Sequence, residues 1–418
     1  MANIDNNKKL LFKNTAMLYV LQFSTYLLSF ATVPYQTRVL GPVVYGVVGV
    51  AIATMAYFQL FMDFGFLLSA TEDISLHRDD RDFVSKKLTS IAIIKAVFFL
   101  ASVALIGILM LFVKPFSEYK ALYFIYILAY GVNSFLPDYF YRGIEKMSSI
   151  TVRTVAVKLF SCVLTFVFLR SEEDYLVIPI LMLLGNIGAV IWAYLYIYKN
   201  LKYPFRKVTL QEVIHDFKRS ASFFLARIAS TVYSATNTVV IGAVDTTGIM
   251  TGYFTSADKV MTVAKSTIAP ISDSFYPYMV KNRNFSLIKK VILVVEPVIL
   301  IGCAVVWIFA EPLCVLAFGQ EFAGTAPILR GFIPAIAVLL PSYILGFPTL
   351  GAMKLAKFAN YSIFFGTAIH IAGMALLFLT SNVTGTALAY LTSVSEISIM
   401  LFRLITVIVK RKSWNNPA

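Results

Sequence analysis

Twelve long apolar stretches follow one another along the chain, and they limit its fold more than any other feature. They cover residues 11–36, 43–70, 88–113, 120–140, 154–170, 176–198, 220–244, 250–277, 290–310, 326–350, 358–380 and 386–409. Most are long enough for an α-helix to cross a hydrocarbon core of about 30 Å. The pattern predicts an all-α polytopic membrane protein with twelve transmembrane helices, and it excludes a barrel of short, alternating strands.

Positive charge is distributed unevenly over the connections between these stretches. Of 36 Lys and Arg residues, 25 lie in the two tails and every second loop, 4 lie in the other six loops, and 7 lie inside the stretches. Lys13, Lys120, Arg170 and Lys290, at the edges of stretches, are counted with the adjoining tail or loop. Basic residues near membrane helices stay on the cytoplasmic side, so we expect both termini in the cytoplasm. Segment 141–153, with Arg153 at its end, falls on this side. Because orientation explains the net charge of +14, that charge does not indicate a nucleic-acid partner.

The two halves of the chain resemble each other. Residues 12–16 (FKNTA) and 217–221 (FKRSA) open the first and seventh stretches, and the longest inside loop lies between the halves. We therefore predict an N-terminal six-helix lobe (1–198), a cytoplasmic linker (199–219) and a C-terminal six-helix lobe (220–418). The lobes are related by a parallel pseudo-two-fold repeat. Transporters built from such repeats keep the substrate path between the halves.

Catalytic and metal-binding signatures are absent from the sequence. The connections are too short for a soluble domain of 50 residues or more, and no GxxxxGK[ST] motif for ATP binding occurs. The three cysteines are scattered and predict no disulfide framework, and no His/Cys spacing predicts a metal site. The polar start and long first stretch predict an uncleaved first helix. We expect a protein that is not an enzyme and needs no cofactor, driven by an H⁺ or Na⁺ gradient or by the gradient of its substrate.

Three short motifs carry a family resemblance. Residues 38–46 read RVLGPVVYG, residues 252–260 read GYFTSADKV and residues 275–277 read FYP. They resemble the R-x-LGP-x-x-YG, G-x-[YF]-x-x-A-x-[KR] and helix-ending motifs of Wzx-type O-antigen flippases, in the same order over nearly the whole chain. The resemblance implies the MATE-like fold of the multidrug/oligosaccharidyl-lipid/polysaccharide exporter superfamily. It also implies flipping of undecaprenyl-pyrophosphate-linked O-antigen units across the bacterial inner membrane, for lipopolysaccharide biosynthesis.

Flipping such a lipid-linked oligosaccharide requires a polar, cationic path, because charge in hydrocarbon is costly and sugar hydroxyls lose water there. Arg binds a pyrophosphate through paired hydrogen bonds and Lys through its point charge. The cations inside the stretches are Lys95, Lys158, Arg227, Lys259, Lys265, Arg330 and Arg403.

A subset of these cations is predicted to line a central cavity. Lys158, Arg330 and Arg403 lie closer to the expected helix ends, where their side chains can reach the interface. We predict substrate binding by Lys95, Arg227, Lys259, Lys265 and Arg38, the last because it lies on the outside against the charge rule.

Two buried acids, Asp258 and Glu396, have two open interpretations. Each shares a helix face with a cation seven residues later, Lys265 and Arg403 respectively, so internal ion pairs would lower the cost of burial. Alternatively, one of the two acids takes up H⁺ or Na⁺ during antiport.

Several other residues also have a structural and a functional interpretation. Pro327, Pro334, Pro341 and Pro348 recur every seven residues. They predict a bent helix, with Pro334 and Pro341 as a hinge or a static kink. Gly41-Pro42 predicts a tight turn and Tyr45 an aromatic anchor at the outer interface, which would make the first motif a hairpin connector. His370 is either a hydrogen-bonded packing residue or a proton relay.

These features favour three functions to different degrees. An O-antigen flippase accounts for the excess of buried cations, whereas a MATE-like drug exporter would favour acids and aromatics in its path. An O-antigen polymerase requires large, arginine-bearing outside loops, and those here are short. The flippase is therefore preferred, with membrane lipids, an O-antigen polymerase and the chain-length machinery as candidate partners.

Overall fold

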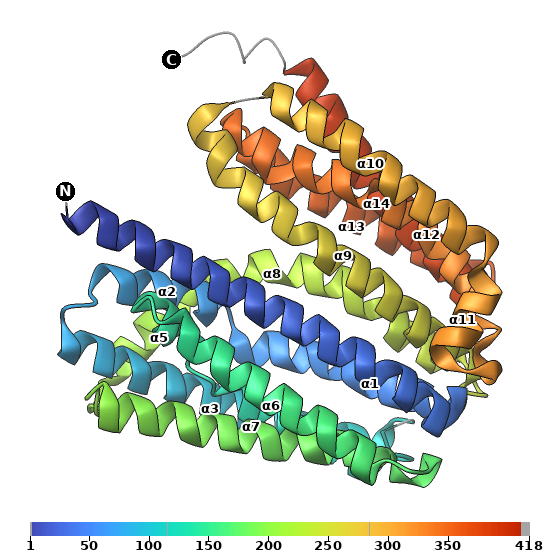
Figure 1. The fold of residues 1–418 in the computed structure, drawn as a ribbon. Helices are drawn as coiled ribbons and strands as arrows, with labels where there is room; N and C mark the ends of the chain where they lie inside the picture. The colour runs from blue at the N-terminus through green and yellow to red at the C-terminus, as the bar shows by residue number, and fades with distance from the viewer. Residues whose placement is uncertain (1, 115, 284, 411–418) are drawn as a thin grey trace. The chain divides into compact units, whose positions relative to one another are not determined.

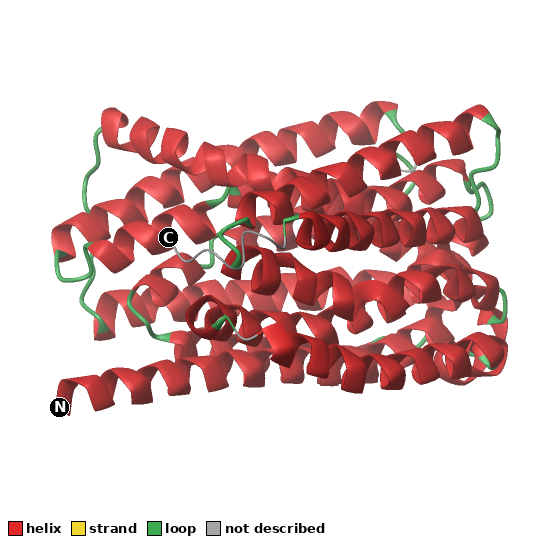
Figure 2. Ribbon diagram, turned by 90° about the horizontal axis from the view of Figure 1, so that it is seen from above, coloured by secondary structure: helices red, strands yellow, loops and turns green. Residues whose placement is uncertain are grey.

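The computed structural model consists of α-helices joined by short loops, and the residues that it describes contain no β-strand (Figure 2). The backbone is described for residues 2–114, 116–283 and 285–410. The side chains of residues 2–13, 15, 18, 222, 225–227, 229–234, 273–274, 277 and 280–282 are excluded.

The helices of the first half are α1 (Ala2–Asp63), α2 (Phe66–Leu76), α3 (Arg81–Phe112), α4 (Lys120–Ser134), α5 (Asp138–Gly143), α6 (Met147–Phe168), η1 (Glu172–Leu176), α7 (Val177–Leu195) and η2 (Tyr196–Asn200). Those of the second half are α8 (Leu210–Val244), α9 (Ile249–Asn282), α10 (Phe285–Ile308), α11 (Ala310–Phe318), η3 (Gln320–Phe322), α12 (Thr325–Ile344), η4 (Leu345–Gly351), α13 (Ala356–Leu379) and α14 (Gly385–Val409).

Each predicted apolar stretch overlaps helical backbone, although residues 135–137 interrupt the stretch 120–140. Eight helical stretches of the described chain are long and apolar enough to cross a membrane, and the first of these, Tyr19–Leu76, covers two predicted stretches. The remaining predicted stretches contain the broken α4–α5 pair, α8 and α9. The prediction of an all-α polytopic membrane protein is confirmed.

Backbone packing groups the chain into two compact units. The N-terminal unit comprises residues 1–40 and 51–235, and the C-terminal unit comprises residues 41–50 and 236–418. The division therefore falls within α8, which is drawn in yellow-green in Figure 1. The predicted lobes, 1–198 and 220–418, were defined from the sequence repeat, whereas these units are defined from backbone contacts. The division into two lobes stays a prediction.

The core of the N-terminal unit lies around α2, α3 and α5. Phe66, Ile91, Tyr139 and Phe140 are each at most 2% exposed there. Pro137 precedes α5 and interrupts the predicted continuous helix 120–140, because proline lacks a backbone donor. This break places α5 beside α2.

The first two motifs of the sequence pack against each other in the C-terminal unit. Gly41 interrupts α1 with φ 64° and ψ 173°, a left-handed value that favours glycine. Just beyond, α1 lies against the start of α9: a Cβ on Gly46 would stand 2.6 Å from the carbonyl oxygen of Gly248 and 2.7 Å from the nitrogen of Gly252. Small residues permit such close approach between membrane helices. The motif is thus a helix-packing surface as well as a turn.

Tyr45 does not have the interfacial position expected from the sequence. Its side chain is 3% exposed, and its ring centroid lies 6.1 Å from that of Phe322 in an edge-to-face contact. The ring packs inside the C-terminal unit and does not serve as the predicted interfacial anchor, because the part of α1 that carries it packs tightly on α9.

Candidate substrate-binding site

Lys95 lies on the buried face of α3 in the N-terminal unit. Its Nζ donates a hydrogen bond to the carbonyl oxygen of Ser134 and lies 3.8 Å from Oδ1 of Asp63. Ser134 ends α4, so the break before Pro137 leaves this carbonyl without a helical partner. These contacts give Lys95 a structural role at the break, and substrate binding by it stays a proposal.

Helix α9 carries three of the candidate charges in the C-terminal unit. Asp258 and Lys259 are half-buried in the first third of this helix. Nζ of Lys265 lies 2.8 Å from Oε1 of Glu396 on α14. The side chain of Glu396 is 6% exposed and that of Lys265 is 26% exposed. Lys265, which was predicted to bind substrate, and Glu396, which was predicted to couple an ion, therefore form one ion pair.

The predicted pairing of Glu396 with Arg403 is wrong. Glu396 pairs across helices with Lys265, whereas Nη1 of Arg403 donates to the carbonyl oxygen of Ser342 at 2.8 Å and Nε donates to Oγ of Ser362 at 2.8 Å. Arg403 is also 7% exposed and hydrogen-bonded inside the unit, so it does not reach an interface as expected.

His370 occupies the centre of a buried hydrogen-bond chain. Its Nε2 lies 2.9 Å from Oδ1 of Asn237 and its Nδ1 lies 3.1 Å from Oγ of Ser395. Asn237 in turn donates to Oγ1 of Thr392 at 2.9 Å. These contacts link α8, α13 and α14, as expected for a hydrogen-bonded packing histidine, and the proton-relay alternative stays a hypothesis.

Helix α12 remains helical through both proposed hinge prolines. At Pro334, the hydroxyl of Ser393 on α14 donates to the carbonyl oxygen of Gly331 (2.6 Å) and accepts from the backbone N–H of Ala335 (3.0 Å). The Ser393 hydroxyl is thus inserted between the Gly331 carbonyl and the Ala335 N–H, which would bond directly to each other in a regular α-helix. The sequence singled out the prolines, but it gave no signal for Ser393, because the partner lies on another helix.

The backbone leaves helical geometry further on, at Gly346, whose ψ is −124°. Just before this break, the Ser342 carbonyl accepts both from the backbone N–H of Leu345 and from Nη1 of Arg403. The kink predicted for this helix is therefore located at a glycine, and a hinge at Pro334 and Pro341 stays a prediction.

The other candidate cations have separate positions. Arg38 is exposed near the end of the first segment of α1. Nε of Arg330 donates to the carbonyl oxygen of Trp307 at 3.0 Å. The side chain of Arg227 lies outside the described residues.

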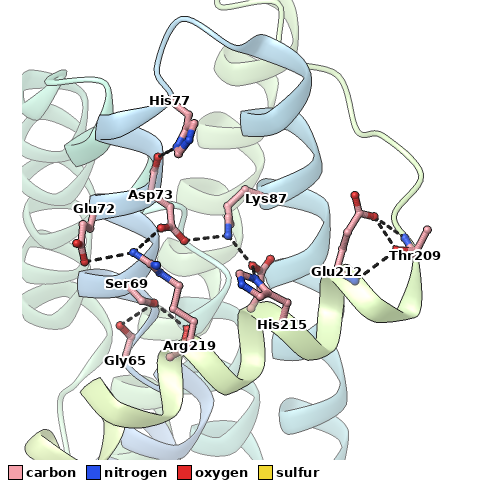
Figure 3. Close-up of polar contacts among 12 residues, drawn as sticks. Gly65, Ser69, Glu72, Asp73, His77, Lys87, Thr209, Glu212, His215 and Arg219 are labelled. Atoms are coloured by element: carbon pink, nitrogen blue, oxygen red, sulfur yellow. Dashed lines mark hydrogen bonds and ion pairs between the residues drawn. The ribbon is translucent and has the colours of Figure 1, made fainter.

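A cluster of charged residues that was not predicted joins α2, α3 and α8 in the N-terminal unit (Figure 3). Nζ of Lys87 lies 2.9 Å from Asp73 and 2.5 Å from Asp216, and Arg219 lies 2.7 Å from Asp73. Lys87, Asp73 and Asp216 are buried, so the pairing lowers the cost of removing their charges from water. Sequence reasoning assigned these residues to solvated loops, because hydropathy alone does not distinguish a loop charge from a paired one.

The same helix α8 begins with an exposed capping arrangement. The backbone N–H and the hydroxyl of Thr209 donate to the Glu212 carboxylate at 2.7 and 3.0 Å (Figure 3), and these bonds hold the pKa of Glu212 below its usual range. A carboxylate in the first turn also interacts favourably with the helix dipole. The cap fixes where α8 starts, and hence the register of Asp216 and Arg219.

Comparison with known families decides the family of the chain. The family described as "Polysaccharide biosynthesis protein" matches residues 11–283. The chain belongs to this family. Among the relatives of the chain, the "Putative O-antigen transporter" of Escherichia coli (strain K12) is 27% identical over 295 residues, covering 70% of each chain. The Shigella dysenteriae protein of the same name is 26% identical over 281 residues, covering 66% of this chain and 69% of the relative. The resemblance stated from the motifs is confirmed.

Solved structures establish the fold. An inward-facing MATE multidrug transporter aligns with a TM-score of 0.73 at 12% identity, covering 94% of this chain and 96% of the transporter. The lipid II flippase MurJ in an inward closed conformation aligns with a TM-score of 0.65 at 16% identity, covering 94% and 87%. This member of the polysaccharide biosynthesis family therefore has a MATE-like polytopic fold, as the sequence predicted.

Proposed function

We propose that this chain is a flippase. It moves undecaprenyl-pyrophosphate-linked O-antigen units from the inner to the outer leaflet of the bacterial inner membrane. Family membership and relatives described as O-antigen transporters support this assignment. The proposal also places both termini in the cytoplasm. Its partners are an O-antigen polymerase and the chain-length machinery, which receive the flipped unit.

The observation that carries the proposal is the positive charge held within membrane-embedded helices. Lys259 and Lys265 are both half-buried, six residues apart along α9. A cation in this position is costly unless it has a task, and intramembrane charges commonly mark substrate pathways. A pyrophosphate supplies the complementary charge, which a neutral or cationic drug does not. Lys259 is therefore the first residue that we assign to substrate, with Lys265, Lys95, Arg227 and Arg38 as further candidates.

Ion coupling through Asp258 or Glu396 is part of the same proposal. The Lys265–Glu396 pair supports it, because a cation that leaves Glu396 for a pyrophosphate would free the carboxylate to take up H⁺ or Na⁺. A small-molecule exporter of the MATE type is the second candidate, which the fold and these two acids favour.

Deletion of the gene with complementation tests the flippase. Lipid-linked units should accumulate in the inner leaflet and surface polysaccharide should disappear. A deletion strain without that accumulation overturns the proposal, and loss of drug efflux instead would favour the exporter.

Lys259→Ala and the charge-conserving control Lys259→Arg test the cationic path in the same strain. Loss of one charge-assisted contact predicts a roughly 10-fold to 100-fold slower transfer for Lys259→Ala at equal expression. Full activity of this variant would contradict a substrate role for Lys259.

A further inference from the structure

A cavity of about 420 Å³, lined by both polar and apolar side chains, opens within the N-terminal unit. This volume is typical of a small-molecule site. Helices α1, α4, α6 and α7 enclose it, with Arg153 and Lys158 from α6 and Gln36 and Gln59 from α1 among the lining residues. The sequence assigned neither cation to a site: Lys158 was expected to reach an interface and Arg153 to lie in an inside loop.

Lys158 lies in the middle of the membrane-embedded helix α6. Because α6 begins at Met147, seven residues before the predicted start, Lys158 is about 17 Å from one end and about 15 Å from the other. Its side chain therefore does not extend to an interface, and the prediction that it does so is wrong. Lys158 is half-buried and has no hydrogen bond or ion pair with any described residue. An unpaired cation at this depth points to a function.

Arg153 is the second positive group of the cavity. It is 4% exposed, and its Nη2 lies 2.6 Å from Oδ1 of Asp138. Its Nε and Nη1 have no hydrogen-bond partner among the residues described. Buried donors are nearly always satisfied, so two open donors on one guanidinium indicate a missing acceptor. A guanidinium offers such donors in a fork that matches the oxygens of a phosphate.

The rest of the lining favours an anion over a cation. Among the described residues that line the cavity there is no Asp or Glu. The amides of Gln36 and Gln59 form no hydrogen bond with a described residue. A metal cation would find no carboxylate in the lining, whereas phosphate oxygens would find the ammonium of Lys158, the guanidinium of Arg153 (paired on one side with Asp138) and neutral amide donors.

We propose that this cavity binds the phosphate group of a lipid headgroup, with Lys158 and Arg153 as the anion-binding residues. Lys158 supplies an unneutralised charge, and Arg153 supplies a second positive group, whose unpartnered Nε and Nη1 are buried beside the cavity and would turn toward a bound phosphate. The phosphate belongs either to an anionic phospholipid or to the pyrophosphate of a lipid carrier. Only the carrier source rests on the proposed flippase function.

Binding of defined lipids to the purified full-length protein tests the site. Native mass spectrometry in neutral detergent compares phosphatidylglycerol with diacylglycerol, and undecaprenyl pyrophosphate with undecaprenol. At least one phosphorylated lipid should bind more tightly than its neutral counterpart. Binding of phosphatidylglycerol alone assigns the site to a phospholipid, and binding of undecaprenyl pyrophosphate alone assigns it to the carrier. Equal binding within both pairs overturns the proposal.

Two variants locate the binding. Lys158→Met should weaken the binding of the phosphorylated lipid by roughly 10-fold to 100-fold. Lys120→Met, the same change at the exposed start of α4, should leave the binding affinity unchanged. Arg153→Lys keeps the charge beside Asp138 but loses the fork, and it should also weaken binding. Wild-type affinity in both cavity variants overturns the assignment. The assay measures no translocation, so its failure is distinct from failure of the flippase proposal.

Discussion

The buried pair Lys265–Glu396 allows a quantitative test of how charge is held in the C-terminal unit. Lys265→Met and Glu396→Gln each remove one charge with little change in volume, and the double variant removes both. The two single changes should not be equal. Glu396 is 6% exposed and its carboxylate would be left without its cation, whereas Lys265 is 26% exposed and keeps some access to polar surroundings.

The magnitudes follow from the cost of an unpaired buried charge. Breaking such a pair costs about 3–5 kcal/mol, but a carboxyl can also take up a proton. Protonating an ordinary glutamate at pH 7 costs about 4 kcal/mol, so that value is the upper limit for Lys265→Met. Glu396→Gln should cost about 1–2 kcal/mol, and the double variant should lie within about 1 kcal/mol of wild type, since replacing both partners is often nearly neutral. The coupling energy should then exceed about 2 kcal/mol.

Denaturant titration of the purified protein measures these differences. A thiol-reactive dye reports unfolding, because Cys162, Cys303 and Cys314 are buried in the folded state. The exposed pair Arg78–Glu145 is the matched control, for which the same cycle should give a coupling energy below about 1 kcal/mol. If the effects of Lys265→Met and Glu396→Gln simply add, the ion pair does not hold the two helices as described, and the reasoning is refuted.

Three further predictions use the same unfolding assay. Ser393→Ala should destabilise the protein by about 1–3 kcal/mol, because it leaves two backbone groups of α12 unsatisfied. In the control Ser398→Ala, the lost hydroxyl bonds only to its own helix, so the stability should change little. Equal effects of the two variants would contradict the role of the Ser393 hydroxyl. Gly252→Ala should be destabilising by about 1–3 kcal/mol, because its Cβ would overlap the α1 backbone, whereas Gly302→Ala, with open space around it, should not be. Asp245, between α8 and α9, is partly buried, which raises its pKa, but hydrogen bonds from the first turn of α9 and the preceding loop outweigh this and lower the pKa below the usual value. Its stabilisation should be present above pH of about 4 and be lost as the pH falls further, so a stability difference between wild type and Asp245→Ala that persists at low pH would refute this account.

Much of the fold could be predicted from hydropathy, since each helix that faces lipid must be apolar over a membrane thickness. The errors occurred where polar groups are satisfied inside the protein. The start of α6 was placed at residue 154 because Arg153 resembles a loop residue, yet its pairing with Asp138 allows it to be buried in the helix. The break before Pro137 was missed because apolar and aromatic residues continue on both sides of it, at Phe135, Leu136, Tyr139 and Phe140.

The candidate site was less predictable, because its contacts join helices that are distant in sequence. Helical spacing suggested that Glu396 pairs with Arg403, but its partner is Lys265, on α9. Likewise, no sequence pattern within α12 identifies Ser393, on α14, as the residue that completes the hydrogen bonds of α12. Composition indicated that buried charges exist, and only the packing of helices determines which of them neutralise one another and which, like Lys158, remain unpaired.

The assignment of residues 41–50 to the C-terminal unit affects how the protein is made. These residues are synthesised early, but their close-packed partner, Gly252, follows about 200 residues later. At about 5–20 residues per second, the glycine surface around Gly46 remains uncovered for roughly 10–40 s of translation. During that interval the second membrane segment is inserted without its final neighbour. Residues 41–50 thus cannot reach their final packing before α9 is synthesised, and a ribosome that stops between the two leaves a membrane segment whose glycine surface is uncovered.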